Sequence, residues 1–502
     1  MNLLVLPVLV PLLSAVVLMA LDGRSWAARW VSLGSALGTF LAAVVLLVHT
    51  AGGEIATLSL GHWGAGLGIV WVVDGLSAIL LTLSGLVFLA TVIYAPGGLR
   101  DEGESRHFWA LLQFLAVGVN GSFLTADFFN LFVFFEIMLL TSFVLMCLGG
   151  RDRQLERAFP YVAVNLVGSL IFLAGVGALY GVAGTVNMAE LSHRLAAGTV
   201  GDGVWPALTL ILFVFGIKAA LVPVFFWLPD SYPEAPIPVS ALFAGLLTKV
   251  GVYAFFRVVP LISVDGPGIV QPVLLVVAAA TMLVGVLGAL GRSEIRSILS
   301  FHVISQVGYM VFGLALYTPL AVAAGIFYIV HHIVVKTALF FAGGMAERMG
   351  ESGVLGRVRG VAATHPWVAV GFFVPAMALA GLPPFSGFWG KFFLILGGLE
   401  AEAWIATGVA ILVGLLTLAS MLKIWVATFW GPVQGMVVPA RGRDPGMLGA
   451  TLGLAALSVA IGLGAPQVLN LSERAADQLL EVRPYVEAVR GSPSRVVAEA
   501  DP

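Results

Sequence analysis

Cysteine and charge are the two features that this sequence has least of. A single cysteine, Cys147, stands among 502 residues, which excludes a disulfide framework, an iron–sulfur cluster and a zinc site built from cysteines. Only 10% of the residues are charged, whereas 60% are hydrophobic. Because soluble domains carry about 25% charged residues, this composition excludes an ordinary soluble protein.

The composition indicates a membrane protein instead. The mean hydropathy is +1.03, and such long apolar stretches belong in a lipid bilayer. The net charge is −2 and no basic patch is present, so we expect no nucleic-acid partner. The sequence therefore predicts an all-α polytopic membrane protein.

Fourteen apolar stretches are long enough to cross a bilayer. No basic residue precedes the first of them, whereas Arg24 and Arg29 follow it. We therefore expect a retained helix with its N-terminus outside rather than a signal peptide. The stretches lie at roughly 2–20, 27–49, 74–95, 107–125, 128–149, 158–182, 205–228, 238–259, 268–290, 297–317, 319–346, 367–398, 403–430 and 447–465.

The loop arginines agree with this topology, since cytoplasmic loops of membrane proteins carry an excess of positive charge. The loops between spans that are predicted to lie outside hold only Arg194 and, at a helix end, Arg257. The polar segment 470–490 becomes an outside tail with the weak amphipathic pattern of a surface helix. The predicted inside arginines are Arg24, Arg29, Arg100, Arg106, Arg151, Arg153, Arg157, Arg292, Arg296, Arg348, Arg357, Arg359, Arg441 and Arg443.

Lysine is the rarer cation, and it occurs only where charge is expensive. Of the 25 lysines and arginines, five are lysines, and all five lie inside apolar stretches. Every arginine lies in a loop, at a helix end or in the tail. Lysine is therefore not used here as a solubilising charge. The five are Lys218, Lys249, Lys336, Lys391 and Lys423.

One acid, Glu136, lies in the apolar segment LFVFFEIMLLT. A charged residue at a helix centre costs about 2.5–3.5 kcal/mol, so four lysines and Glu136 together cost more than about 10 kcal/mol, as much as a whole domain's stability. A function explains such residues better than chance. A desolvated lysine can release its proton whereas an arginine cannot, so the pattern predicts a row of proton carriers.

Structural interpretations compete at three of the lysines. Lys423 lies near the inside end of its span, which favours a side chain that extends to the membrane interface. Lys218 could serve purely as the partner of Glu136. Lys249, in GLLTKVGVY, has small neighbours that would admit water, which favours a functional role.

Histidines accompany one lysine in the segment VHHIVVKTALFF. His332 and Lys336 are four residues apart, on one helix face and about 6 Å from each other, and histidine titrates near neutrality as a relay requires. His331 points about 100° away and is expected to pack or hydrogen-bond. His302 either lines a water path or is packed. No third ligand stands at a motif spacing, so we predict no metal site.

Prolines interrupt two of the spans. In FGIKAALVPVFFWLP, Pro223 cannot donate to the carbonyl of Ala219, and in LAGLPPFSGFWGKFF, Pro383 and Pro384 precede Lys391. Two broken spans in separate halves, each with a lysine, indicate an inverted-repeat transporter with sites near the midplane.

These segments together resemble a known family. FFEIM, the block from Lys218 to Gly251, SQVGYM, HHIVVKTALFF and GLPPFSGFWGKF resemble the antiporter-like, proton-translocating subunits of respiratory complex I and of the Mrp-type Na+/H+ antiporter. The resemblance covers roughly Asp74 to Trp430. It implies about fourteen transmembrane helices, two inverted five-helix repeats (spans 4–8 and 9–13) and broken helices 7 and 12. The implied units are 1–100, 101–262 (first repeat), 263–432 (second repeat) and 433–502.

The resemblance also assigns residues to the proton path. Glu136 matches the family's span-5 glutamate, Lys218 the span-7 lysine and Lys249 the span-8 lysine. His332 matches the span-11 histidine, and Lys391 occupies a span-12 position that is glutamate in one of the complex I subunits and lysine in others.

The chain's length, its N-terminal sequence and the lysine at position 391 favour the Mrp branch. Span 6 has Asn165 and Gly168 where the largest complex I subunit has charges. A subunit of complex I or of a membrane-bound hydrogenase is the alternative, and copurifying iron–sulfur proteins would favour it. An inert membrane scaffold is disfavoured by the lysines.

The Mrp branch implies no cofactor on this chain and a place in the bacterial inner membrane. The implied partners are the other proteins of the Mrp complex (one large, called A, and five small, called B, C, E, F and G), protons, and Na+ exchanged by the complex. No carboxylate cluster offers a sodium site, so we expect protons in this chain. In the predicted mechanism Glu136 pairs with Lys218 and sets its proton affinity. The predicted carriers after Lys218 are Lys249, His332, Lys336 and Lys391.

Overall fold

The computed structural model describes residues 3–21, 26–62, 68–99, 107–264, 266, 268–435 and 444–491. Within these ranges eleven helices are long and apolar enough to cross a membrane, and three shorter apolar helices occupy further predicted spans. The prediction of an all-α polytopic membrane protein is confirmed, whereas the count of fourteen spans stays a prediction. Arg24, Arg100, Arg106, Arg441 and Arg443, which entered the topology prediction, lie outside the described residues.

The apolar helices fall in two groups along the chain. Those of the N-terminal half are α1 (Leu6–Ala20), α2 (Trp26–Thr50), α3 (Gly75–Gly98), α5 (Phe108–Leu124), α6 (Phe128–Met146), α7 (Asp152–Ala183), α9 (Val204–Ala219), α11 (Ile237–Leu242) and α12 (Thr248–Ile262). Those of the C-terminal half are α13 (Val270–Gly291), α14 (Ile295–Leu316), α15 (Pro319–Gly350), α17 (Pro366–Ala380), α18 (Ser386–Glu400), α19 (Trp404–Ile424) and α20 (Pro445–Leu463).

Shorter elements connect or extend these helices. The 3-10 turns are η1 (Leu3–Val5), η2 (Leu60–His62) and η3 (Tyr232–Glu234), and the π-helical turns are η4 (Phe243–Leu247) and η5 (Trp425–Phe429). The remaining helices are α8 (Met188–Ala196), α10 (Leu228–Ser231), α16 (Val361–Thr364), α21 (Ala465–Leu480) and α22 (Val482–Arg490).

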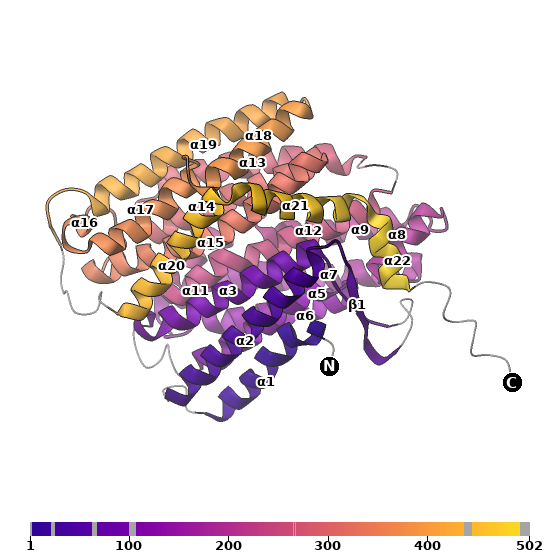
Figure 1. Ribbon diagram of the computed structural model, residues 1–502, viewed down its shortest axis with the longest axis horizontal. Coiled ribbons are helices and arrows are strands. Elements are labelled where there is room, and N and C mark those ends of the chain that lie inside the picture. The colour runs from indigo at the N-terminus through magenta and orange to yellow at the C-terminus, as the bar shows by residue number, and fades with distance from the viewer. Residues whose placement is uncertain are drawn as a thin grey trace.

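A β-hairpin between α2 and α3 was not predicted from the sequence. Its strands β1 (Ala56–Ser59) and β2 (Val70–Val73) pair antiparallel, with Ala56 opposite Val73 and Ser59 opposite Val70. The β-branched VWVV segment is suited to a buried strand, and β2 is buried throughout. Figure 1 shows β1 at the same end of the molecule as α8 and α22. We call this end the hairpin face.

Figure 1 places α16 at the opposite end, and loop arginines gather there around two adjoining cavities, one of which is lined by Arg357, shortly before α16 in the chain. We call this end the arginine face and define it by Arg151, Arg153, Arg292 and Arg357. Glu347 also lies here, 2.7 Å from Arg296. The separation of these arginines from the hairpin face agrees with the topology predicted from the loops.

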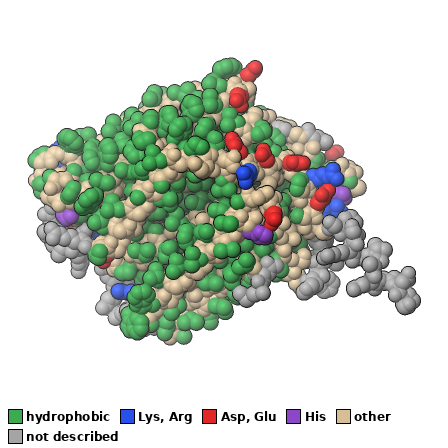
Figure 2. Space-filling model, in the orientation of Figure 1, with side chains coloured by type: hydrophobic (Ala, Val, Ile, Leu, Met, Phe, Trp, Pro, Cys, Tyr) green, Lys and Arg blue, Asp and Glu red, His purple; other side chains and the backbone are tan. Residues whose placement is uncertain are grey.

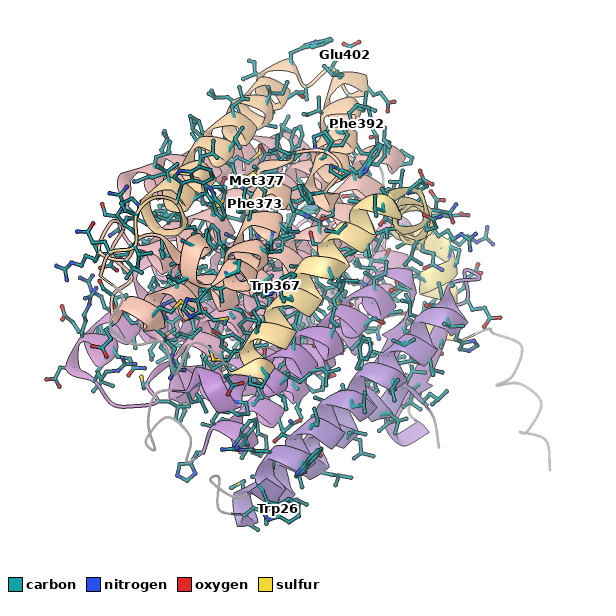
Figure 3. The ribbon with its side chains drawn as sticks, turned by 60° about the vertical axis from the view of Figure 1, so that its left-hand side comes forward. Trp26, Trp367, Phe373, Met377, Phe392 and Glu402 are labelled. Carbon is teal, nitrogen blue, oxygen red and sulfur yellow. The ribbon has the colours of Figure 1, made fainter. Side chains whose placement is uncertain are left out.

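An apolar surface lies between the two faces. Figure 2 shows hydrophobic side chains over the body of the molecule, while charged side chains gather at the end of α8 and α22. Exposed tryptophans mark the helix ends, as expected at membrane interfaces: Trp26, Trp205, Trp367 and Trp404 lie at or beside the starts of α2, α9, α17 and α19, and Trp430 follows the end of η5. Figure 3 shows Trp26 at the start of α2 and Glu402 at the turn between α18 and α19.

The centre of the bundle consists of α11–α12, α14 and α15. Nearly all of their residues are buried, whereas α1, α2, α7, α13 and α19 expose most of one side. A helix that is buried on every side needs apolar residues on every side. Polar side chains on the central helices are therefore enclosed by protein.

Both predicted helix breaks are present. α9 ends at Ala219, the next residue Ala220 has a left-handed φ of 58°, and helix resumes at Leu228. α17 ends at Ala380, Gly381 has a φ of 92°, and α18 begins at Ser386. The broken helices 7 and 12 are confirmed, and each leaves backbone groups without a partner in their own helix.

The predicted outside tail forms two amphipathic helices, α21 and α22, that lie on the hairpin face. Gln478 accepts a hydrogen bond from the Gly75 amide at 2.9 Å, and Arg490 forms an ion pair with Glu190 on α8 at 2.8 Å. The α21–α22 segment thus holds the start of α3 and the helix α8 together.

Beneath α22 lies a buried ion pair. Arg257 of α12 contacts Asp74, the N-cap residue of α3, at 2.7 Å, and the two side chains are 3% and 1% exposed. The guanidinium carbon lies 4.6 Å from the ring centroid of Tyr485 on α22. Arg257, expected at the end of a span, therefore has a buried structural partner that the sequence analysis did not identify.

Candidate functional site

Lys218 lies one residue before the end of α9 and is 3% exposed. Its ammonium donates long hydrogen bonds to the carbonyl oxygen and Oδ1 of Asn165, at 3.4 and 3.5 Å, and to Oγ of Ser169 at 3.5 Å. Asn165 and Ser169 lie one turn apart on α7. The proton of Lys218 is therefore held by neutral oxygens.

The predicted direct pair between Glu136 and Lys218 is wrong in this structure. Within the described ranges no ion pair of 4.0 Å or less joins them, and Oε1 of Glu136 is buried without a hydrogen-bond partner. α7 packs against both α6 and α9, and its Asn165 reaches Lys218 in place of the carboxylate. Glu136 is nevertheless near enough to attract the ammonium through space.

Lys249 lies at the start of α12, directly after the π-helical turn η4. Its ammonium donates to the carbonyl of Ala244 at 2.6 Å and to Oγ1 of Thr248 at 3.2 Å. Gly251 permits the close packing of α12 on the end of α9, because a Cβ there would lie 2.6 Å from the Ala219 nitrogen. The helix of Lys249 therefore touches the break that follows Lys218.

His332 and Lys336 are fully buried on α15. Lys336 donates to the carbonyl of Leu299 on α14 at 2.9 Å, while neither ring nitrogen of His332 has a hydrogen-bond partner in the described residues. Lys249 and Lys336 both lie within electrostatic range of His332. The structure thus brings the predicted pair together with Lys249.

His302 and His331 each have a hydroxyl partner. Nε2 of His302 lies 2.8 Å from Oγ of Ser420, and Nδ1 of His331 lies 2.7 Å from Oγ of Ser386. The second nitrogen of each ring is buried without a hydrogen-bond partner among the described residues. The expectation that His331 packs or hydrogen-bonds is confirmed.

Lys391 lies five residues into α18 and is 7% exposed. Its ammonium reaches back across the second break and donates to the carbonyls of Leu379 and Ala380, the last residues of α17, at 3.0 and 3.1 Å. It also lies 5.2 Å from the ring centroid of Tyr309. The free carbonyls at a helix C-terminus favour a positive charge, so the break itself provides the site for Lys391.

Lys423 differs from the other lysines in its place. It donates to the carbonyls of Leu290 and Arg292 at 2.9 and 2.6 Å, and so caps the C-terminal end of α13 on the arginine face. This agrees with the structural interpretation of Lys423 and separates it from the row of buried lysines.

Lys218, Lys249, Lys336 and Lys391, which we call the row, have one property in common. Among the residues that the structure describes, each ammonium donates only to carbonyl, carboxamide or hydroxyl oxygens, and none touches a carboxylate. Such oxygens stabilise the charged form without taking up its proton, so the row can hold protons and release them. No cluster of three or more metal-ligating side chains occurs in the described residues.

Sequence reasoning did not identify the neutral side chains that contact the buried lysines and histidines. Asn165, Ser169 and Ser420 lie in apolar spans without any motif that marks them, and the motifs that contain Tyr309 and Ser386 did not indicate a role for these two side chains. Asn165 stands out in the sequence only because it occupies a span-6 position that is charged in the largest complex I subunit. Polar residues of this kind are common in membrane helices, so their presence alone carries little signal.

Residues 125–417 match a family described as "NADH:quinone oxidoreductase/Mrp antiporter, TM". The chain belongs to this family. It is 41% identical to the D subunit of the Na(+)/H(+) antiporter of Alkalihalophilus pseudofirmus over 97% of this chain and 99% of that protein. It is 36% identical to the D subunit of the Na(+)/H(+) antiporter of Bacillus subtilis, with the same coverage.

Solved structures of the NADH:quinone oxidoreductase/Mrp antiporter family have the same fold. A chain of the Mrp complex from Dietzia sp. superimposes with a TM-score of 0.92 at 38% identity, over 97% of this chain and 99% of that one. A chain of respiratory complex I from Thermus thermophilus gives 0.80 at 27% identity, over 95% and 99%. The resemblance inferred from the motifs is confirmed, and the Mrp branch is the more similar of these two.

Proposed function

We propose that this chain is the D subunit of a multisubunit Na+/H+ antiporter and carries protons along its buried lysines. The observation that carries the proposal is the row of four ammonium groups that are bonded to neutral oxygens. Similarity to antiporter D subunits over almost the full length supports the assignment. The chain would act as part of a secondary transporter in a bacterial inner membrane, with its N-terminus outside and the A, B, C, E, F and G proteins of the complex as partners.

The proposed route runs along the middle of the bundle. Lys218 releases its proton toward Lys249, and the further carriers are His332, Lys336 and Lys391. Glu136 acts on Lys218 through space, because Asn165 occupies the contact position. A change at Glu136 caused by a neighbouring subunit would alter how strongly Lys218 holds its proton.

A cavity of about 350 Å³ on the arginine face supports access to this route from the inside. Its lining includes Arg296, which donates to Oγ of Ser240 on α11 at 3.1 Å. Ser240 lies one helical turn before Ala244, and the carbonyl of Ala244 accepts from Lys249. Polar groups thus extend from the cavity to the first half of the row.

Lys218→Arg tests the proposal. Arginine keeps the positive charge and can still donate to Asn165 and Ser169, so we expect normal assembly. It cannot release a proton, so Na+-dependent proton movement in everted membrane vesicles, followed with a pH-sensitive dye, should fall at least about a hundredfold. Substantial exchange in this variant would show that position 218 is a fixed charge.

A proton-pumping module of a redox complex is the second candidate. Its support is similarity to a chain of the membrane-bound sulfane sulfur reductase, described as an archaeal respiratory membrane complex, at 25% identity and a TM-score of 0.89, besides complex I. Purification of the assembled complex in mild detergent distinguishes the two candidates. Small hydrophobic subunits without flavin or iron support the antiporter, and iron–sulfur subunits support the redox complex.

A further inference from the structure

The second helix break, residues 381–385, carries a titratable side chain at each of its ends. At the end of α17, the ammonium of Lys391 donates to the carbonyls of Leu379 and Ala380. At the start of α18, Oγ of Ser386 lies 2.7 Å from Nδ1 of His331. His331 is therefore attached to the same helix that carries Lys391.

The ring of His331 is held through only one of its nitrogens. The chain of contacts from Nδ1 continues from Oγ of Ser386 to Oγ of Ser458 on α20 at 3.1 Å. A hydroxyl both donates and accepts, so Ser386 can accept the Nδ1 hydrogen and donate its own to Ser458. Nε2 is buried, and the described residues offer it no hydrogen-bond partner, so its lone pair remains available.

The position of His331 along the row differs from that of His332. His331 lies within electrostatic range of both Lys391 and Lys336, whereas the lysines within range of His332 are Lys249 and Lys336. The two adjacent histidines thus cover successive intervals of the row. His332 covers the interval before Lys336. His331 covers the interval after it, within range of the same two lysines as His302, and only His331 contacts Ser386 on the helix that carries Lys391.

We propose that His331 is the proton carrier between Lys336 and Lys391, with Ser386 and Ser458 as positioning residues. In the first step an N–H bond of the Lys336 ammonium breaks as a bond to Nε2 forms, directly or through water. In the second step the Nε2–H bond breaks as the amine of Lys391 takes up the proton. This deepens the proposed function and rests on it.

The two helix ends give the second step a direction. His331 contacts the first residue of α18, where the free amides of a helix N-terminus disfavour a positive charge. Lys391 contacts the last carbonyls of α17, where a positive charge is favoured. A proton on His331 is therefore a short-lived intermediate that passes to Lys391.

His331→Asn is the deciding variant. The asparagine amide can still donate to Ser386 from near the position of Nδ1, but it has no nitrogen that takes up a proton. In everted vesicles of the assembled complex, we expect Na+-dependent proton movement to fall at least about tenfold at normal membrane levels. In His331→Ala, proton movement should fall by a similar factor. If the complex with His331→Ala does not assemble, the result with His331→Asn still decides.

The positioning role has its own measurement. Ser386→Ala should lower the exchange rate several-fold, and Ser386→Thr, which keeps the hydroxyl, should restore it. Ser472→Ala is the matched control, because this buried hydroxyl donates to the carbonyl of Val468 within its own helix, α21. Equal losses in Ser386→Ala and Ser386→Thr would show that the site responds to packing and would overturn the positioning role.

Lys336→Arg separates this inference from the proposed relay. If Lys336→Arg abolishes exchange while His331→Asn keeps more than half of it, the relay stands and the role of His331 is wrong. If Lys336→Arg exchanges normally, the relay itself is wrong, and the role of His331 is wrong with it. Loss in both variants supports the inference.

Discussion

Charges inside this protein fall into two classes with different partners. Toward the two faces, arginines contact carboxylates: Arg257 with Asp74, and Arg296 with Glu347, both at 2.7 Å. At the centre, lysines such as Lys249 contact carbonyls and hydroxyls. A permanent cation beside an anion is a structural pair, whereas a titratable cation beside neutral oxygens can give up its proton.

Glu136 belongs to neither class. It is a carboxylate in the region of the lysines, yet it contacts none of them. Direct contact with Glu136 would make Lys218 hold its proton more strongly. Attraction through space is weaker, so Lys218 can release its proton, and a change at Glu136 can still alter the proton affinity of Lys218. The comparison therefore predicts which changes affect stability and which affect transport.

The largest effect is expected from Asp74→Asn. Asparagine can still cap α3, since its oxygen can accept from the Ser77 amide as Asp74 does, but Arg257 would lose its buried counter-charge. Removing one partner of a buried pair costs about 3–5 kcal/mol. We expect a lower unfolding temperature of the purified complex and lower membrane levels, with the exchange rate per assembled complex unchanged.

Glu190→Gln is the matched control for this variant, because the pair of Glu190 with Arg490 lies at the surface and exposed pairs contribute about 0–1 kcal/mol. Equal losses of stability in the two variants would remove the distinction between the buried pair and the surface pair. A specific loss of exchange in Asp74→Asn would place the pair on the proton route.

Asn165→Asp would give Lys218 a carboxylate partner, as the arginines near the two faces have. The new carboxylate would lie at the contact position of Lys218 and hold its proton more strongly, so release should require a higher pH. We expect about a tenfold lower exchange rate at neutral pH, equivalent to about 1.4 kcal/mol, with partial recovery under alkaline conditions.

The double variant Asn165→Asp with Glu136→Gln is the control, since it removes one of the two acids near Lys218 and should recover part of the rate. An unchanged rate in Asn165→Asp would mean that release from Lys218 does not limit transport. Near-normal exchange in Glu136→Ala alone would exclude any gating by Glu136.

The smallest effect is expected at Asp127, the N-cap of α6, a carboxylate without a cationic partner among the described residues. Burial raises the pKa of Asp127 to about 6, although the Asn130 amide donates to it at 2.8 Å. Because this pKa lies above its ordinary value, folding favours the protonated acid. Its contribution to stability is full below about pH 3.8 and is lost as the pH rises to about 6.

Asp127→Asn should keep the helix cap and remove this pH dependence. We expect the unfolding temperature at pH 7 to rise by about 2 °C or less, and the variant and the wild type to converge near pH 4. A large fall at pH 7 would show that the carboxylate form of Asp127 is stabilised by a contact outside this chain.

The sequence predicted the charged members of the site but not their neutral partners, for a physical reason. A lysine in an apolar span has a high energetic cost, so Lys218 and Lys391 were identified from the sequence. The prolines in the same spans predicted both helix breaks. Asn165 and Ser386 cost little in a membrane helix, so nothing in the sequence indicated that they contact Lys218 and His331. The direct Glu136–Lys218 contact was wrong because spacing fixes the face of a helix but not the distance across a third helix.

The β-hairpin escaped prediction for a related reason. VWVV is apolar and directly precedes Asp74, so by composition it is a continuation of the next span. Its pairing with β1 depends on a partner strand ten or more residues away. Short apolar strands and buried helix segments cannot be told apart by periodicity alone.

The α21–α22 segment has a consequence for how the protein is made. Tyr485, which covers the Arg257–Asp74 pair, is synthesised after the apolar helices α1 to α20. Until then Arg257 and Asp74 lack this cover on the hairpin face. The two charges can therefore be inserted while still in contact with water, and they are covered only after α22 has been synthesised. A chain that stops before α21 would retain its apolar helices but lack this final closing step.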